Sequence, residues 1–236
     1  MDFSKRSTVE EHMDNPILDK ESYKKAYKDI NRCNTLLGGS DITIKAIRKL
    51  IDENPQKSYT IMDMGCGDGH MLRLIAKRFR GRDIKLHLVG IDLRDDVITV
   101  AREASQDFPE ILFQEADILD LTQVQDCDIL LCTLTMHHFE EADIKTFGRR
   151  FGELAKLGVV INDLQRSKVA YHLFKLFSFF FVKTKIAKED GLISISKSFR
   201  RHELQQIADT IEGLRHTITW KWAFRYLWTM QPLQAQ

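Results

Sequence analysis

Three alternating glycines, Gly65, Gly67 and Gly69, follow an apolar segment that ends at Asp63. Glycine permits a tight turn with φ > 0 and lets a ligand press against bare backbone. Apolar residues with the spacing of one helix face come next, and the start of such a helix offers unpaired N–H groups to an anionic part of a ligand. These residues are Met71, Leu72, Ile75 and Phe79. The stretch therefore predicts the first strand–loop–helix unit of a nucleotide-binding sheet.

An acidic residue, Asp92, ends the next apolar segment at residues 85–91. An acid at the tip of the second strand is placed to accept hydrogen bonds from ribose hydroxyls. The dinucleotide fingerprint would require a further Gly or Ala at position 70, where this chain has His70. An NAD-dependent oxidoreductase is therefore a weaker alternative.

Further polar residues follow the later apolar segments. Asp117, after residues 111–115, either binds the adenine side of a nucleotide or caps a helix that begins at Ile118. His137 and His138 follow residues 127–135 and serve either as a general base or acceptor ligand, or as packing groups in a loop. Asp163 ends residues 158–163; it and Arg166 either touch an acceptor or are a helix cap and a surface cation.

Composition and charge are typical of one cytoplasmic enzyme domain. The net charge of +1 provides no electrostatic reason to expect nucleic acid as a partner. The four cysteines form no C-x-x-C pair, and no His, Cys and Asp residues have metal-ligand spacing, so we expect free thiols and no metal. The N-terminus lacks the apolar region of a signal peptide, and no apolar stretch is long enough for stable membrane insertion.

The elements that position these residues alternate along the chain. We predict strands at 58–64, 85–91, 111–115, 128–134 and 158–163, and helices at 70–80, 95–107 and 140–156. This alternation predicts an α/β fold with a parallel sheet covered on both faces. Open sheets of this kind bind ligands beyond the carboxyl ends of their strands. Two further helices, 19–37 and about 41–55, precede the first strand.

The pattern changes after residue 163. Residues 169–182 carry five of the fourteen phenylalanines and are interpreted as a lid over an acceptor pocket, as core, or as a membrane-surface helix. Phe174, Phe177 and Phe181 share one face of the predicted helix. We then predict a turn at 188–191, a helix at 199–211, and an antiparallel hairpin of strands 216–222 and 224–230.

The sequence resembles the class I S-adenosylmethionine-dependent methyltransferases, and within them the small-molecule branch that includes bacterial quinone and aromatic-polyketide enzymes. The resemblance rests on the glycine loop with Asp63, on Asp92, and on the segments 116–118 and 134–139. It implies a Rossmann-like three-layer α/β/α sandwich with a seven-stranded, mostly parallel sheet and a C-terminal antiparallel hairpin. It also implies an N-terminal helical cap at 1–57, and a core at 58–236 that contains a lid insertion at about 165–198.

The same resemblance implies S-adenosylmethionine as the cofactor and a small apolar acceptor, aromatic, phenolic or polyketide-derived. O-methylation is favoured and C-methylation comes second; a non-catalytic cofactor-binding relative is the alternative. We expect His137, His138 and Asp163 to be the catalytic candidates, and the protein to be a monomer or homodimer. The expected cofactor residues are Asp63, Gly65, Cys66, Gly67, Gly69, Asp92, Leu93, Asp117, Ile118 and Thr133.

Overall fold

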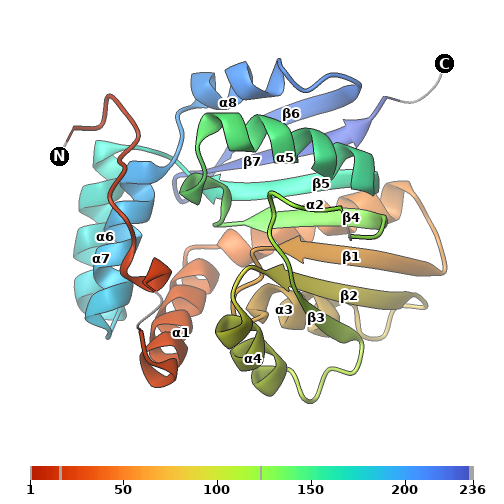
Figure 1. Ribbon diagram of the computed structural model, residues 1–236, viewed down its shortest axis with the longest axis horizontal. Coiled ribbons are helices and arrows are strands. Elements are labelled where there is room, and N and C mark those ends of the chain that lie inside the picture. Colours follow the sequence, from red (N-terminus) through yellow and green to blue (C-terminus); the bar gives the residue numbers. More distant parts are fainter. Residues whose placement is uncertain (1, 16–17, 123, 234–236) are drawn as a thin grey trace.

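A single seven-stranded sheet runs through the protein in the order β3-β2-β1-β4-β5-β7-β6 (Figure 1). The computed structural model describes residues 2–15, 18–122 and 124–233. Strands β1 to β5 are parallel, and β7 pairs antiparallel with both β5 and β6. The strands are β1 Ser58–Met64, β2 Lys85–Asp92, β3 Ile111–Glu115, β4 Cys127–Thr133, β5 Ala155–Leu164, β6 Leu214–Lys221 and β7 Arg225–Pro232. The predicted sheet and its C-terminal hairpin are confirmed.

The central strands are apolar on both faces because helices cover both sides of the sheet. In β4, Ile129 and Leu131 pack into one core cluster, and Leu130 and Cys132 pack into the cluster on the opposite face. The alternation follows from the two-residue period of a strand. The first cluster lies under α2 Gly39–Glu53 and α3 His70–Phe79, and the second under α5 Glu141–Leu154 and α8 Arg201–Ala208. The result is the predicted three-layer sandwich.

The order of the strands reverses between β1 and β4. The chain adds β2 and β3 on one side of β1, and then β4 and β5 on the other. Loops that leave β1 and β4 therefore diverge at the carboxyl edge of the sheet, which opens a space for a ligand between them.

A group of helices closes this edge of the sheet. They are α1 Lys20–Leu36, α6 Lys168–Phe181 and α7 Lys185–Lys197, together with the short helix η1 His12–Asp14. Figure 1 shows α1, α6 and α7 on the left, beyond one end of the strands, and α7 contacts α1, α6 and η1. Helix α2, in contrast, packs directly on the sheet as part of the core. Within the described residues, no helix is both long enough and apolar enough to cross a membrane.

The predicted turn at residues 188–191 was wrong, because these residues lie inside α7. The helix begins after Thr184, whose hydroxyl accepts the N–H of Ala187. Polar groups on α7 are buried against the N-terminal segment: Asp190 accepts the N–H groups of His12 and Met13. Gly191 leaves room for the ring of Phe174, which would lie 2.4 Å from a Cβ at this position.

Two predicted helix ends also differ from the structure. Strand β5 begins at Ala155, so the predicted helix 140–156 ends at Leu154, and the predicted helix 199–211 is the shorter α8. The remaining helix of the sheet layers, α4, spans Asp95–Ala104. Helix boundaries depend on where strand pairing begins, which a helical pattern alone does not record.

Arg166 is a structural residue rather than the predicted surface cation or acceptor contact. Its side chain is completely buried and forms an ion pair with Glu203. The guanidinium also donates to the carbonyl oxygens of Ser198, at 2.7 Å, and Phe3, at 3.1 Å. It therefore joins the end of β5 to α8 and to the N-terminal segment.

We predict that Arg166→Met lowers the free energy of unfolding by about 3–5 kcal/mol, because the substitution leaves Glu203 and two carbonyl groups without their partner. Chemical denaturation monitored by circular dichroism measures this change. The exposed Arg215→Met serves as the control and should change stability little. Equal stabilities of the two variants would contradict the structural role of Arg166.

Candidate active site

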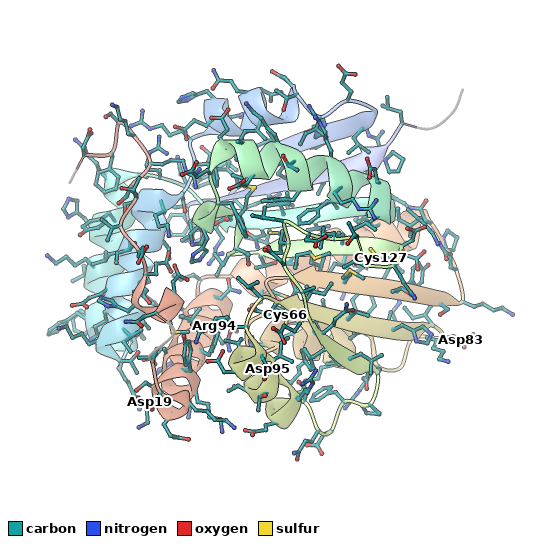
Figure 2. The ribbon with its side chains drawn as sticks, in the orientation of Figure 1. Asp19, Cys66, Asp83, Arg94, Asp95 and Cys127 are labelled. Atoms are coloured by element: carbon teal, nitrogen blue, oxygen red, sulfur yellow. The ribbon has the colours of Figure 1, made fainter. Side chains whose placement is uncertain are left out.

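A cavity of about 740 Å³ lies at the carboxyl edge of the sheet. Its floor comes from the loops after β1, β2 and β4, and its walls come from α1, α6, α7 and the turn between β6 and β7. Figure 2 shows Cys66 and Arg94 near this edge, whereas Asp83 lies at the opposite end of the strands. A volume of this size suits a small molecule together with part of a cofactor.

The glycine loop is tied to the end of β2. The N–H groups of Gly65 and Cys66 donate to the carbonyl oxygen of Ile91 at 2.8 and 2.9 Å. The N–H of Gly67 donates to Oδ2 of Asp92 at 2.9 Å. The predicted loop and the predicted acid are thus parts of one hydrogen-bonded unit that faces the cavity.

Helix α1 provides a second reason for glycine at position 67. The backbone there has φ = +53°, and a Cβ would lie 2.8 Å from the ring of Tyr27. Asn31, one turn further along α1, donates to Asp68 at 2.9 Å. Helix α1 therefore covers the loop directly, and both residues line the cavity.

Two acids face the cavity from neighbouring strands. Asp63, at the end of β1, is 2 % exposed, and its Oδ1 has no hydrogen-bond partner among the described residues. Burial, together with the nearby charge of Asp92, raises the pKa of Asp63 to about 7. Burial also raises the pKa of Asp92. Paired buried acids of this kind favour a ligand that carries positive charge or hydrogen-bond donors.

The other predicted cofactor residues fall into two groups. Leu93, Ile118 and Thr133 line the cavity, as do Gly65, Cys66 and Gly67. Gly69 and Asp117 are not in its lining. Asp117 accepts the N–H of Leu119 at 2.8 Å in a turn; the helix predicted to begin at Ile118 is wrong, and the adenine-side role of Asp117 stays a prediction.

His137 lies between two carboxylates. Its Nδ1 is 2.7 Å from Oδ1 of Asp163, and its Nε2 is 3.4 Å from Oε1 of Glu11. Burial alone would lower the pKa of His137, but the charge and hydrogen bond of Asp163 and the charge of Glu11, whose Oε1 is too poorly placed for a hydrogen bond, raise it to about 9. A pKa of about 9 means that the ring is protonated and positively charged at neutral pH. Asp163 is not among the residues that line the cavity, and its contact with Nδ1 holds the His137 ring in place.

His138 is the more accessible of the two histidines. Its Nδ1 is 3.2 Å from Oδ2 of Asp14, and its Nε2 is 3.8 Å from Oε2 of Glu11. The ligand atoms of Glu11, His137 and His138 lie within 4.8 Å of one another, so these described residues can hold a metal ion. The ion pairs with Asp14, Asp163 and Glu11 account for the same arrangement.

Helix α6 forms a wall of the cavity. Phe174 and Phe177 line it, and the Phe177 ring stacks on Phe181 at a centroid distance of 4.7 Å. The opposite side of the helix faces outward, with Phe179 and Phe180 exposed by 73 % and 68 %. The helix is therefore packed on one side only, and its predicted role as a lid concerns that inner side.

Several lining residues were missed by the sequence analysis. Tyr27 and Asn31 lie on a helix that was predicted, but nothing in the pattern placed them over the glycine loop. Glu11 and Asp14 come from an N-terminal segment with no clear periodicity. Arg225, at the start of β7, also lines the cavity.

Comparisons with known proteins agree with this geometry. Residues 61–158 match the family described as "Methyltransferase domain". No curated protein matches the chain significantly. Magnesium protoporphyrin IX methyltransferase from Synechocystis PCC 6803, solved with bound SAH, is 14 % identical with a TM-score of 0.60, and the match covers 90 % of this chain and 94 % of that one.

Two other solved structures are similar. The plantazolicin methyltransferase BpumL, in complex with a pentazolic desmethylPZN analog and SAH, is 17 % identical with a TM-score of 0.65, over 91 % of this chain and 95 % of that one. A SAM-dependent methyltransferase from Aquifex aeolicus is 15 % identical with a TM-score of 0.61, over 92 % of this chain and 100 % of that one. At these identities the likeness shows a shared fold.

The His137 ion pair predicts a pH-dependent stability. Its raised pKa means that the stabilisation is complete below about pH 6.5, the ordinary value for histidine, and is lost as the pH rises toward 9. The melting temperature should therefore fall between pH 7 and about 9. Asp163→Asn should be less stable at pH 7, and its difference from the wild type should narrow toward pH 9. A constant difference across this range would contradict the protonated state of His137.

Proposed function

We propose that this chain, which contains a class I S-adenosylmethionine-dependent methyltransferase domain, transfers the methyl group of S-adenosylmethionine to a small, apolar, aromatic or phenolic acceptor. The observation that carries the proposal is the glycine loop bonded to Asp92 and bordered by the buried Asp63, at the point where the strand order reverses. All three solved structures named above are of methyltransferases, and two of them contain SAH.

The charges of the cavity suit this cofactor. S-adenosylmethionine carries a sulfonium and an ammonium group, and the unpaired Oδ1 of Asp63 would accept from the ammonium group. Asp92 would accept from the ribose hydroxyls, with Leu93, Asp117 and Ile118 on the adenine side. We assign the backbone of Gly65, Cys66, Gly67 and Gly69, and Thr133 opposite them, to the amino-acid part of the cofactor.

The acceptor side of the cavity is mostly apolar and ends at the two histidines. Methyl transfer from a sulfonium is an in-line displacement, so the protein contributes mainly by alignment, which is worth about 7–11 kcal/mol in the best intramolecular cases. An acceptor hydroxyl must also lose its proton. We assign proton acceptance to His138, and stabilisation of the resulting oxyanion to the protonated His137, whose Nε2 has no hydrogen-bond partner among the described residues. This arrangement favours O-methylation, with C-methylation second.

The cofactor assignment makes a prediction for Asp92. Asp92→Ala should weaken S-adenosylhomocysteine binding by about 1.5–3 kcal/mol, the range for hydrogen bonds to a charged group. Isothermal titration calorimetry measures this change, and Asp83→Ala, at the far end of the sheet, is the matched control. Unchanged affinity in Asp92→Ala, or tighter binding of NADH than of S-adenosylhomocysteine by the wild type, would contradict the assignment.

Helix α6 provides a second prediction. Phe177→Ala should raise KM for the acceptor or lower kcat, because the inner wall of the cavity loses an aromatic surface. Its cost in stability should stay below the roughly 3–5 kcal/mol of a fully packed phenylalanine. The outward-facing Phe180→Ala is the control and should leave both kinetic constants unchanged. A large fall in melting temperature with normal kinetics would instead make Phe177 an ordinary core residue.

A further inference from the structure

Arg225 is a buried cation without a counter-charge in contact with it. Its side chain lines the cavity, although the residue is only 3 % exposed. Nε and Nη1 have no hydrogen-bond partner, and the guanidinium forms no ion pair with any residue in the described ranges 2–15, 18–122 and 124–233. Burial lowers the pKa of Arg225 to about 10, so the group is still charged at neutral pH.

Arg166, the other buried arginine among the described residues, is paired. Arg166 is equally buried, but Glu203 and backbone carbonyl groups occupy its guanidinium. The charge of Asp163 acts on Arg225 from a distance, but no carboxylate contacts the guanidinium. A buried charge without a hydrogen-bonded partner is costly, and a ligand that supplied one would offset this cost. Arg225 therefore has the features of a ligand-binding residue rather than of a structural one.

The surroundings of Arg225 form a small polar site in an apolar wall. Asn34, from the end of α1, is buried beside it; its Nδ2 donates to Oγ of Ser40, and its Oδ1, an acceptor, is without a partner, so Arg225 supplies the donors of this site. The side chains of Asn34 and Arg225 can pack against the backbone of residue 39 only because that residue is glycine. A Cβ on Gly39 would lie 2.0 Å from Oδ1 of Asn34 and 2.6 Å from Cζ of Arg225. The surrounding lining is largely apolar and includes Leu37, Leu164 and Phe224.

This polar site lies away from the glycine loop. Along α1, Asn34 is seven residues beyond Tyr27, which contacts the glycine loop; at 1.5 Å per residue this is a separation of about 10 Å. Across the sheet, β7 is three strands from β1, about 14 Å at the usual strand spacing. Arg225 is thus displaced from the glycine loop both along α1 and across the sheet.

We propose that Arg225 is a carboxylate-binding subsite and that the methyl acceptor supplies the carboxylate. A guanidinium forms strong, charge-assisted hydrogen bonds to carboxylates, and the unpaired Nε and Nη1 of Arg225 each have an N–H group available for such a bond. The identification of the bound carboxylate as part of the methyl acceptor rests on the proposed function. It narrows the acceptor to an apolar or aromatic body that carries an acid group away from the methylated atom.

Two pairs of probes test the subsite in the protein saturated with S-adenosylhomocysteine. They are 2-naphthoate with 2-naphthamide, and decanoate with decanamide, which differ in charge but little in size. The wild type should bind at least one acid about tenfold or more tightly than its amide, and Arg225→Met should remove this preference while Arg225→Lys keeps part of it. Equal affinity for both acids and their amides in the wild type would overturn the proposal.

The melting temperature distinguishes a binding role from a structural role. Without ligand, Arg225→Met should melt at or above the wild-type temperature, because it removes an unpaired buried charge, whereas Arg166→Met should melt well below it. If Arg225→Met destabilises the protein as strongly as Arg166→Met does, Arg225 is structural and the proposal fails.

The cofactor also carries a carboxylate, so its contribution must be measured separately. S-adenosylhomocysteine and its decarboxylated analogue should each bind Arg225→Met as they bind the wild type. A loss of affinity in this variant for S-adenosylhomocysteine alone would assign the carboxylate to the cofactor and overturn the assignment to the acceptor. Failure of S-adenosylhomocysteine to bind the wild type at all would instead refute the proposed function.

Discussion

The hydrogen bond from the N–H of Gly67 to the carboxylate of Asp92 is the contact on which the site depends. It joins the loop after β1 to the tip of β2, and the carbonyl of Ile91 holds the two preceding N–H groups. With the loop fixed in this way, the positive φ at Gly67 becomes obligatory, and Tyr27 can pack against bare backbone. The glycine loop, the end of β2 and the covering helix α1 are therefore held together by one local arrangement.

Buried charge divides the cavity into regions with different chemistry. Two acids, Asp63 and Asp92, face the glycine loop, whereas His137 and Arg225 place positive charge elsewhere in the cavity or beside it. His137 has its counter-charges in Asp163 and Glu11, but Arg225 has none in contact. This division suits a cationic cofactor at one end and an acceptor with anionic character at the other.

The alternating strands and helices of the fold were predictable because the residue pattern of each segment reflects which of its faces is buried. The strands, the glycine loop and the acid at the tip of β2 follow from periodicity and residue type alone. Helix α7 was missed because polar residues such as Asp190 and Ser194 are buried on it, so no apolar face marks it as a helix. The roles of Glu11 and Arg225 depend on contacts, or on missing contacts, with residues far away in the chain, and no local pattern contains that information.

The central claim is that S-adenosylmethionine binds between the glycine loop and α1. Hydrogen–deuterium exchange, measured by mass spectrometry with and without S-adenosylhomocysteine, tests it most directly, because exchange reports the position of the ligand as well as its binding. The account predicts slower exchange in peptides that cover residues 63–70, 92–95 and 27–34, and little change in β6 and β3. Unchanged exchange at residues 63–70, with or without protection elsewhere, would contradict the account.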